Sequence, residues 1–245
     1  MQRTQAIIRA ENVSKVYDMG GKVQVTALKK INLEIGRGEF VSIIGQSGSG
    51  KTTLLDILSA LLRPTSGEVY INGRPISKMD DSELATARGK TIGFIFQSFN
   101  LISRMSALEN VMLPLWFQGV PAAERKKIAA KILADVGLGE RMHHKPNELS
   151  GGQNQRVAIA RALAVDPDII VADEPTGNLD SKSGAVILEM IESLNREKEK
   201  TILIVTHERY VAERAQRVIN IRDGEIVSTE THGSKDSKSI RRDYK

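Results

Sequence analysis

Short hydrophobic runs separated by turn residues are the first pattern along this chain. Four runs are continuous and rich in β-branched residues, which is typical of strands buried on both faces of a sheet. They are residues 40–44, 92–96, 169–172 and 201–206. Residues 31–35 instead alternate apolar and polar side chains, as in a half-buried strand.

Two tight turns indicate hairpins. Residues 68–71 form a short strand pattern that runs into Asn72-Gly73, and residues 217–229 have Asp223-Gly224 near their centre. Asn-Gly and Asp-Gly favour the two-residue turns that join antiparallel strands. We therefore expect a hairpin at each position.

Helical patterns lie between the strands. They cover residues 51–62, 122–136, 151–164 and 181–198. Pro64 stops the first, and Gly137 stops the second after an apolar stripe that includes Ile132 and Leu133. Residues 98–149 look all-helical, as an insertion into an otherwise alternating chain. Alternation of strands and helices predicts an α/β fold with a mostly parallel sheet and covered faces.

The composition of the chain excludes several classes of protein. The chain has 245 residues, 40% hydrophobic and 27% charged, as in an ordinary globular protein. No apolar stretch approaches the about 18 residues of a membrane helix, and the apolar part of the first twelve residues is too short for a secretory signal. Cytoplasmic location is the resulting expectation. The absence of cysteine excludes disulfides, thiolate zinc sites and cysteine nucleophiles.

The basic charge is concentrated at one end. The net charge is +5, and residues 231–245 contain five Lys or Arg and two Asp. The rest of the chain is therefore close to neutral, which argues against a specific nucleic-acid partner. We interpret residues 231–245 as a flexible basic tail, with contacts to phosphates or anionic lipids as the alternative.

A phosphate-binding loop follows the strand at 40–44. The pattern G-x-x-x-x-G-K-[ST] is matched by Gly45, Gln46, Ser47, Gly48, Ser49, Gly50, Lys51 and Thr52, and Thr53 follows. Glycines allow backbone amides to approach phosphate oxygens, and the helix that follows adds the positive end of its dipole. The pattern assigns Lys51 to the β- and γ-phosphates of a nucleotide and Thr52 to Mg²⁺.

An acidic pair ends the strand at 169–172. Asp173 is placed to hold Mg²⁺ through water, and Glu174 is placed to polarise a water molecule in line with the γ-phosphate. Carboxylates at strand ends are common by themselves. Together with the phosphate loop, they indicate a nucleotide hydrolase.

Further motifs resemble those of ATP-binding cassette (ABC) ATPases. The signature motif of that family is matched by Leu149, Ser150, Gly151, Gly152 and Gln153. Tyr17 matches the aromatic residue that stacks on adenine, Gln97 the Q-loop glutamine, residues 178–180 the D-loop, and His207 the switch histidine. The order is that of the family, and the resemblance covers about residues 5–230.

The resemblance implies a single nucleotide-binding domain, residues 1–230. Residues 1–97 and 151–230 would form a P-loop NTPase core with an N-terminal antiparallel β-subdomain. Residues 98–150 would form an inserted α-helical subdomain that ends at the signature motif. Two substitutions depart from the usual pattern: Gln46 stands in place of proline and Asn154 in place of glutamine. Both lie outside the expected catalytic set.

The resemblance also implies a homodimer that holds two ATP molecules head to tail between its subunits. The expected catalytic residues are Glu174, His207, Lys51 and Gln97. Mg²⁺ would be held by Thr52 and Gln97 directly and by Asp173 through water. The residues that would act on the partner's nucleotide are Ser150, Gly151, Gly152, Gln153 and Asp180.

Within the family, four segments resemble the lipoprotein-releasing, macrolide-export and cell-division subgroup. They are residues 17–28, 63–68, 96–101 and 173–180. This implies a peripheral subunit at the cytoplasmic face of the cell membrane that drives a separate integral membrane permease. Candidate permease contacts are the apolar residues Val111, Leu113, Leu115, Trp116 and Phe117, although helical core is the preferred reading for most of them taken singly. A soluble scaffold, such as an iron–sulfur assembly ATPase, is the other reading.

Overall fold

The computed structural model describes residues 6–18, 20 and 24–232. Most of the predicted basic tail, from residue 233 onward, lies outside the described residues. Its first two residues do not belong to a separate tail, because Thr231 ends a strand and the His232 amide donates to the carbonyl of Gln216 at 2.7 Å.

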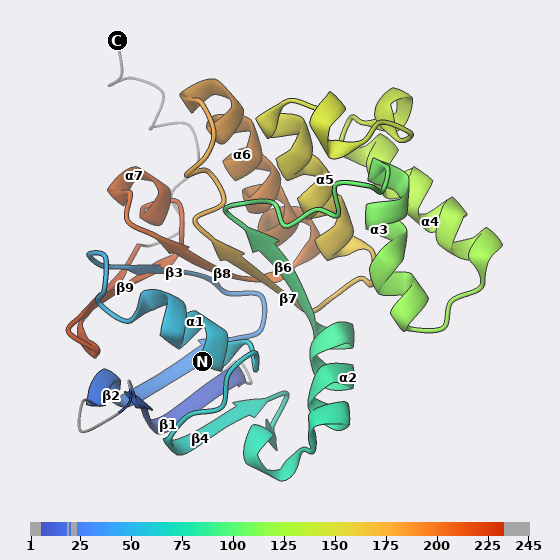
Figure 1. The fold of residues 1–245 in the computed structure, drawn as a ribbon. Coiled ribbons are helices and arrows are strands. Elements are labelled where there is room, and N and C mark those ends of the chain that lie inside the picture. Colours follow the sequence, from blue (N-terminus) through green and yellow to red (C-terminus); the bar gives the residue numbers. More distant parts are fainter. Residues whose placement is uncertain (1–5, 19, 21–23, 233–245) are drawn as a thin grey trace.

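A six-stranded, mostly parallel sheet forms the centre of the molecule (Figure 1). Its order is β10-β9-β3-β8-β7-β6, and only the β9–β10 hairpin is antiparallel. The strands are β3 (Phe40–Ile44), β6 (Ile92–Phe96), β7 (Ile169–Asp173), β8 (Thr201–Thr206), β9 (Arg217–Arg222) and β10 (Glu225–Thr231). The predicted parallel α/β sheet is therefore confirmed.

A second, antiparallel sheet of order β2-β1-β4-β5 lies beside the first. It consists of β1 (Ala6–Asp18), β2 (Gln24–Gly36), β4 (Ser66–Ile71) and β5 (Arg74–Pro75). The alternation seen in the sequence buries Ile31, Leu33 and Ile35 of β2. This is the antiparallel β-subdomain that the family resemblance implied.

Helices divide the hydrophobic interior into three clusters. Helix α1 (Lys51–Leu58) lies between the two sheets and packs against both. Helices α5 (Gly151–Leu163), α6 (Ser181–Lys198) and α7 (Arg209–Ala212) contribute to the cluster on the other face of the parallel sheet. Helices α3 (Ala107–Phe117) and α4 (Ala122–Asp135) share a third cluster with α5, on one side of the molecule (Figure 1).

The first helix is shorter than predicted. It ends at Leu58 rather than at residue 62, because Ala60 adopts a left-handed conformation with φ of 57°. The amides of Leu61 and Leu62 then both donate to the carbonyl of Asp56. The chain therefore turns before Pro64 is reached.

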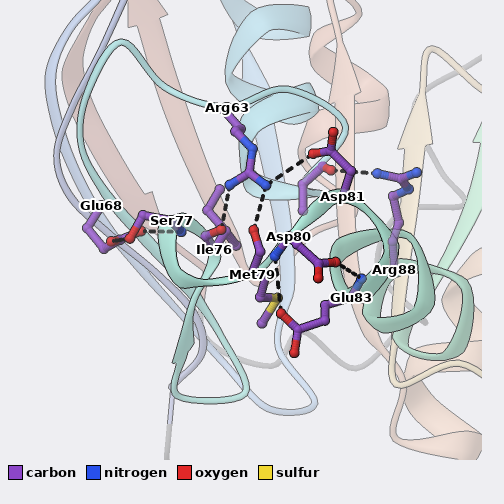
Figure 2. A network of polar contacts seen from close by, with 10 residues as sticks. Arg63, Glu68, Ile76, Ser77, Met79, Asp80, Asp81, Glu83 and Arg88 are labelled. Carbon is purple, nitrogen blue, oxygen red and sulfur yellow. Dashed lines mark hydrogen bonds and ion pairs between the residues drawn. The ribbon is translucent and has the colours of Figure 1, made fainter.

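Helix α2 (Asp81–Thr91) was not expected from the apolar pattern, because only Leu84 of this helix is buried. Polar contacts fix its start instead (Figure 2). Arg63 donates to the carbonyls of Ile76 and Met79, each at 2.7 Å, and to Asp81. The segment after α1 is thereby joined to the start of α2.

The apolar residues of α3 have different environments. Val111 and Leu115 are buried in the third cluster, so they belong to the helical core and are not exposed to a permease. Leu113 is half-buried, whereas Trp116 and Phe117 have exposed fractions of 58% and 77%. Within the described part of the chain, no helix is both long and apolar enough to cross a membrane.

Candidate functional site

A cleft of about 930 Å³ opens where β3 runs into α1. Ten of the expected site residues line it: Gly45, Gln46, Ser47, Gly48, Gly50, Lys51, Thr52, Thr53, Glu174 and His207. Segments far apart in the sequence are thus brought to one edge of the parallel sheet. The carboxyl ends of parallel strands are where ligands bind in open α/β folds.

The loop between β3 and α1 needs its glycines. A Cβ at Gly45 would lie 2.3 Å from the carbonyl oxygen of Ile221, and one at Gly50 would lie 2.6 Å from that of Ala27. Gly50 also has a φ of 100°, and no side chain caps the helix that begins at Lys51. The first amides of α1 therefore remain free to bind an anion.

Lys51 lies inside this loop. Its Nζ donates to the carbonyls of Gly45 and Gln46, each at 2.7 Å, and the side chain is buried. Burial lowers the pKa of the Lys51 ammonium, against the opposing effect of Glu174 and Asp173. The ammonium is therefore held inside the loop, and Glu174 and Asp173 are near enough to act on its charge.

Asp173 ends β7 next to these groups. Burial raises the pKa of its carboxyl group, and the neighbouring Glu174 and Asp56 raise it further. A buried carboxylate among other carboxylates is stabilised by a nearby cation. The residues present thus fit a bound Mg²⁺, which proteins hold with one or two carboxylates together with phosphate oxygens.

Glu174 and His207 form a pair across the cleft. Glu174 Oε1 lies 2.9 Å from His207 Nδ1. Glu174 adopts a left-handed conformation with φ of 43°, and its amide donates to the carbonyl of Val205 in β8. Such a conformation is unusual for a glutamate and is typical of functional sites. Pro175 follows it and disfavours the ordinary helical alternative.

Neither Tyr17 nor Gln97 is among the residues that line the cleft, although Tyr17 lies beside it. Tyr17 Oη is 3.5 Å from Thr53 Oγ1, and Lys15 Nζ is 5.3 Å from the centre of the Tyr17 ring. The Gln97 side chain lies against Gly177, where a Cβ would be 2.6 Å from Gln97 Nε2. Ser49, the remaining residue of the phosphate loop, is buried beneath it.

The signature residues gather elsewhere on the molecule and do not line this cleft. Ser150 caps α5 by accepting from the amide of Gln153, and the Gln153 side chain accepts from the amide of Ser150. A Cβ at Gly152 would lie 3.1 Å from Ser183, near the start of α6. Asp180 caps α6 by accepting from Ser183, and these hydrogen bonds lower the pKa of Asp180.

The turn between β9 and β10 supports the phosphate loop. The amide of Gly224 donates to the carbonyl of Ser49 at 3.0 Å, and the carbonyl of Gly224 accepts from the amide of Lys29 at 2.9 Å. A Cβ at Gly224 would lie 2.7 Å from the carbonyl oxygen of Ala27. Sequence reasoning recognised this turn but not its contact with the loop. The strand residues Val25, Thr26, Ala27 and Asn220, which also line the cleft, were missed as well.

Replacing Gly224 by alanine is expected to weaken nucleotide binding by about tenfold, since the new Cβ pushes the turn away from Ser49 and β2. Gly73 is the matched control. It also has a positive φ, 75°, but nothing lies within 4 Å of a Cβ placed there. Both variants should lose some stability, and only G224A should lose affinity in titrations with a fluorescent ATP analogue. Equal affinities in the two variants would contradict a role for this turn.

Known proteins share both the sequence and the fold. The family described as "ABC transporter" matches residues 28–177. An uncharacterised ABC transporter ATP-binding protein of Thermotoga maritima is 53% identical over 93% of this chain and 96% of its own length. The macrolide export ATP-binding/permease protein MacB of Hyphomonas neptunium is 50% identical over 92% of this chain, which spans only 35% of MacB.

A solved structure gives the same result at the level of the fold. The cassette MJ0796, known in a dimeric post-hydrolysis state with ADP and Pi, has a TM-score of 0.85 and 49% identity. The match covers 92% of this chain and 99% of that one. The phosphate loop, the acidic pair and the signature helix therefore occur in a chain that belongs to the ABC transporter family, as an ATP-hydrolysing cassette.

Proposed function

We propose that this chain is the ATPase subunit of an ABC transporter, in which ATP-dependent dimerisation and hydrolysis drive a separate integral membrane permease. The observation that supports this most strongly is the cleft that gathers the phosphate loop, Glu174 and His207. The alternative of a soluble scaffold would share that cleft, and only the partner would differ.

Each side chain of the cleft has a role in this proposal. Lys51 and the loop amides bind the β- and γ-phosphates. Glu174 orients and deprotonates the attacking water, and its 2.9 Å contact with His207 supports a shared site at the γ-phosphate. Tyr17, beside Thr53 at the far end of the loop, stacks on the adenine.

Thr52, Gln97 and Asp173 would hold Mg²⁺, with Asp173 acting through water. The ion would neutralise negative charge on the phosphates. The raised pKa of Asp173 supports a cation at this position, because the ionised carboxylate needs a neighbouring positive charge. Phe96, the residue before Gln97, is paired with Asp173 across β6 and β7, which supports a role for Gln97 beside that carboxylate.

A second copy of the chain completes each site. The start of α5 is another helix N-terminus that can bind an anion, and Ser150 and Gly151 are exposed there. These residues do not line the cleft of their own chain, which supports a role at the nucleotide of the partner subunit. The dimeric state of MJ0796 supports this arrangement.

The membrane partner is supported by two observations. MacB, at 50% identity, is described as an ATP-binding/permease protein, so a related cassette is joined to a permease in one chain. Trp116 and Phe117 at the end of α3 are exposed, and their ring centroids lie 5.4 Å apart. Such an exposed aromatic pair is suited to binding an apolar surface of another protein. The subunit would then lie at the cytoplasmic face of the cell membrane, as a peripheral protein.

The test is co-purification from detergent-solubilised native membranes with tagged protein that carries Glu174→Gln. A polytopic membrane protein should be retained, and its retention should fall when Trp116 and Phe117 are also changed to serine. The serine variant should keep ATP binding, which separates loss of docking from loss of fold. Recovery of soluble partners alone, from both proteins, would contradict the permease and favour the scaffold.

A further inference from the structure

The loop after β6 has an unusual backbone. Phe99 and Asn100 are consecutive residues with φ of 60° and 48°, so both adopt the left-handed conformation. Asparagine tolerates this region, but a bulky aromatic residue there is a clear outlier. Contacts from other parts of the molecule must therefore hold residues 97–100, the loop that contains Gln97, in this shape.

Arg161 of α5 supplies those contacts. Its guanidinium donates to the carbonyl of Phe99 at 2.9 Å and to the carbonyl of Asn100 at 2.5 Å. The two carbonyls belong to the two left-handed residues. A planar guanidinium can hold two neighbouring acceptors in a fixed geometry, which a lysine ammonium does less well.

The loop also connects two parts of the catalytic machinery. The carbonyl of Gln97 accepts from Asn178 Nδ2 at 3.0 Å, in the segment that follows Glu174. The Phe99 ring lies against the signature motif, because a Cβ at Gly151 would lie 3.9 Å from the Cζ atom of Phe99. A change in the backbone at Phe99 and Asn100 would therefore move Gln97 and the signature contact together.

We propose that Arg161 is a positioning residue, which holds Phe99 and Asn100 in the left-handed conformation. In this way it keeps Gln97 in position to bind Mg²⁺ and keeps the Phe99 ring against Gly151 of the signature motif. The proposal rests in part on the role assigned to Gln97 above. Arg161 does not touch the nucleotide in this account and acts through the loop backbone alone.

The test compares two arginines of one helix. Arg156 also lies in α5 and donates to a backbone carbonyl, that of Val136 at 3.2 Å, but that carbonyl is in the segment after α4. Methionine keeps much of the apolar stem of either arginine. R161M is expected to lower kcat by about tenfold, with little change in KM for ATP, and to raise the Mg²⁺ concentration that half-saturates the protein in a titration with a non-hydrolysable fluorescent ATP analogue. R156M should keep kcat within about twofold of the unmodified protein.

A second substitution separates backbone conformation from general destabilisation. Glycine adopts the left-handed conformation more readily than asparagine, so Asn100→Gly should restore about threefold of the kcat that R161M loses, while the strain at Phe99 remains. It leaves the Phe99 ring in place. If R161M does not fold, R161K with and without Asn100→Gly provides the same comparison, because lysine cannot hold both carbonyls in the same way.

Two outcomes would overturn the proposal: a kcat for R161M equal to that of R156M, or a loss that Asn100→Gly does not relieve. Q97A is measured in parallel. An unchanged Mg²⁺ requirement in Q97A would remove the role of Gln97, whereas the order of kcat among R161M, R156M and R161M/N100G would still decide the role of Arg161.

Discussion

The Glu174→Gln variant is expected to bind ATP with near-normal affinity and to hydrolyse it at least about a hundredfold more slowly. Glutamine has nearly the same shape as glutamate. The φ of 43° at residue 174 and the hydrogen bond from its backbone amide to the carbonyl of Val205 should therefore persist. What is lost is the carboxylate that accepts the proton of the attacking water. Release of phosphate, measured at saturating ATP, gives the rate.

Glu208→Gln is the control for this experiment. Glu208 follows β8, the strand next to the one that Glu174 follows; it accepts from Thr176 at 3.4 Å and does not line the cleft. Its substitution should leave hydrolysis within about twofold. Hydrolysis that stays normal in Glu174→Gln, or falls equally in both variants, would refute the role of Glu174.

The Lys51→Ala variant should lose at least about a hundredfold in affinity for ATP, since charge-assisted hydrogen bonds to phosphate contribute about 1.5–3 kcal/mol each. The folded protein should tolerate the change, because removing a buried ammonium also removes its desolvation cost, the cause of its lowered pKa. Fluorescence titration with an ATP analogue measures the affinity.

Lys29→Ala is the matched control for that loss. Lys29 is another lysine close to the phosphate loop, but its side chain is exposed and pairs with Glu225 at 3.3 Å. Its replacement should change affinity by less than about threefold, as expected for an exposed ion pair. Similar losses in both lysine variants would point to general electrostatic attraction instead of a specific phosphate contact.

Continuous apolar runs located the central strands, because these strands are buried on both faces of the sheet. The strands at Phe40–Ile44, Ile92–Phe96 and Thr201–Thr206 have the predicted bounds, and the helix Ser181–Lys198 does too. In each of these strands most side chains are buried, so the apolar run and the element coincide. Phosphate-loop motifs were equally visible, because their glycines and lysine are adjacent in the sequence.

Elements whose position depends on polar contacts could not be predicted from apolar runs. Helix α2 buries only Leu84, and its start depends on Arg63 and on a capping box between Asp80 and Glu83. The Asp-x-x-Glu spacing was the signal that could have located it. Strand β1 was hidden because irregularities in its pairing with β2 interrupt the alternation.

Contacts between distant segments could not be derived from motifs. Nothing near Gly224 indicates that its amide reaches the phosphate loop, and nothing near Arg161 indicates which carbonyls it binds. Such contacts depend on which loops the fold brings side by side. The family pattern assigned Glu174 and His207 to one site; in the structure both line the cleft and contact each other.

In the proposed dimer, two copies of this chain complete each other's nucleotide sites. Sedimentation equilibrium of Glu174→Gln, a chain of 26.9 kDa, gives its mass in solution with and without Mg-ATP. ATP is expected to double the mass, and adding Ser150→Arg is expected to prevent the doubling while ATP still binds. A doubled mass in the Ser150→Arg variant, or a monomer under all conditions, would rule out shared nucleotide sites.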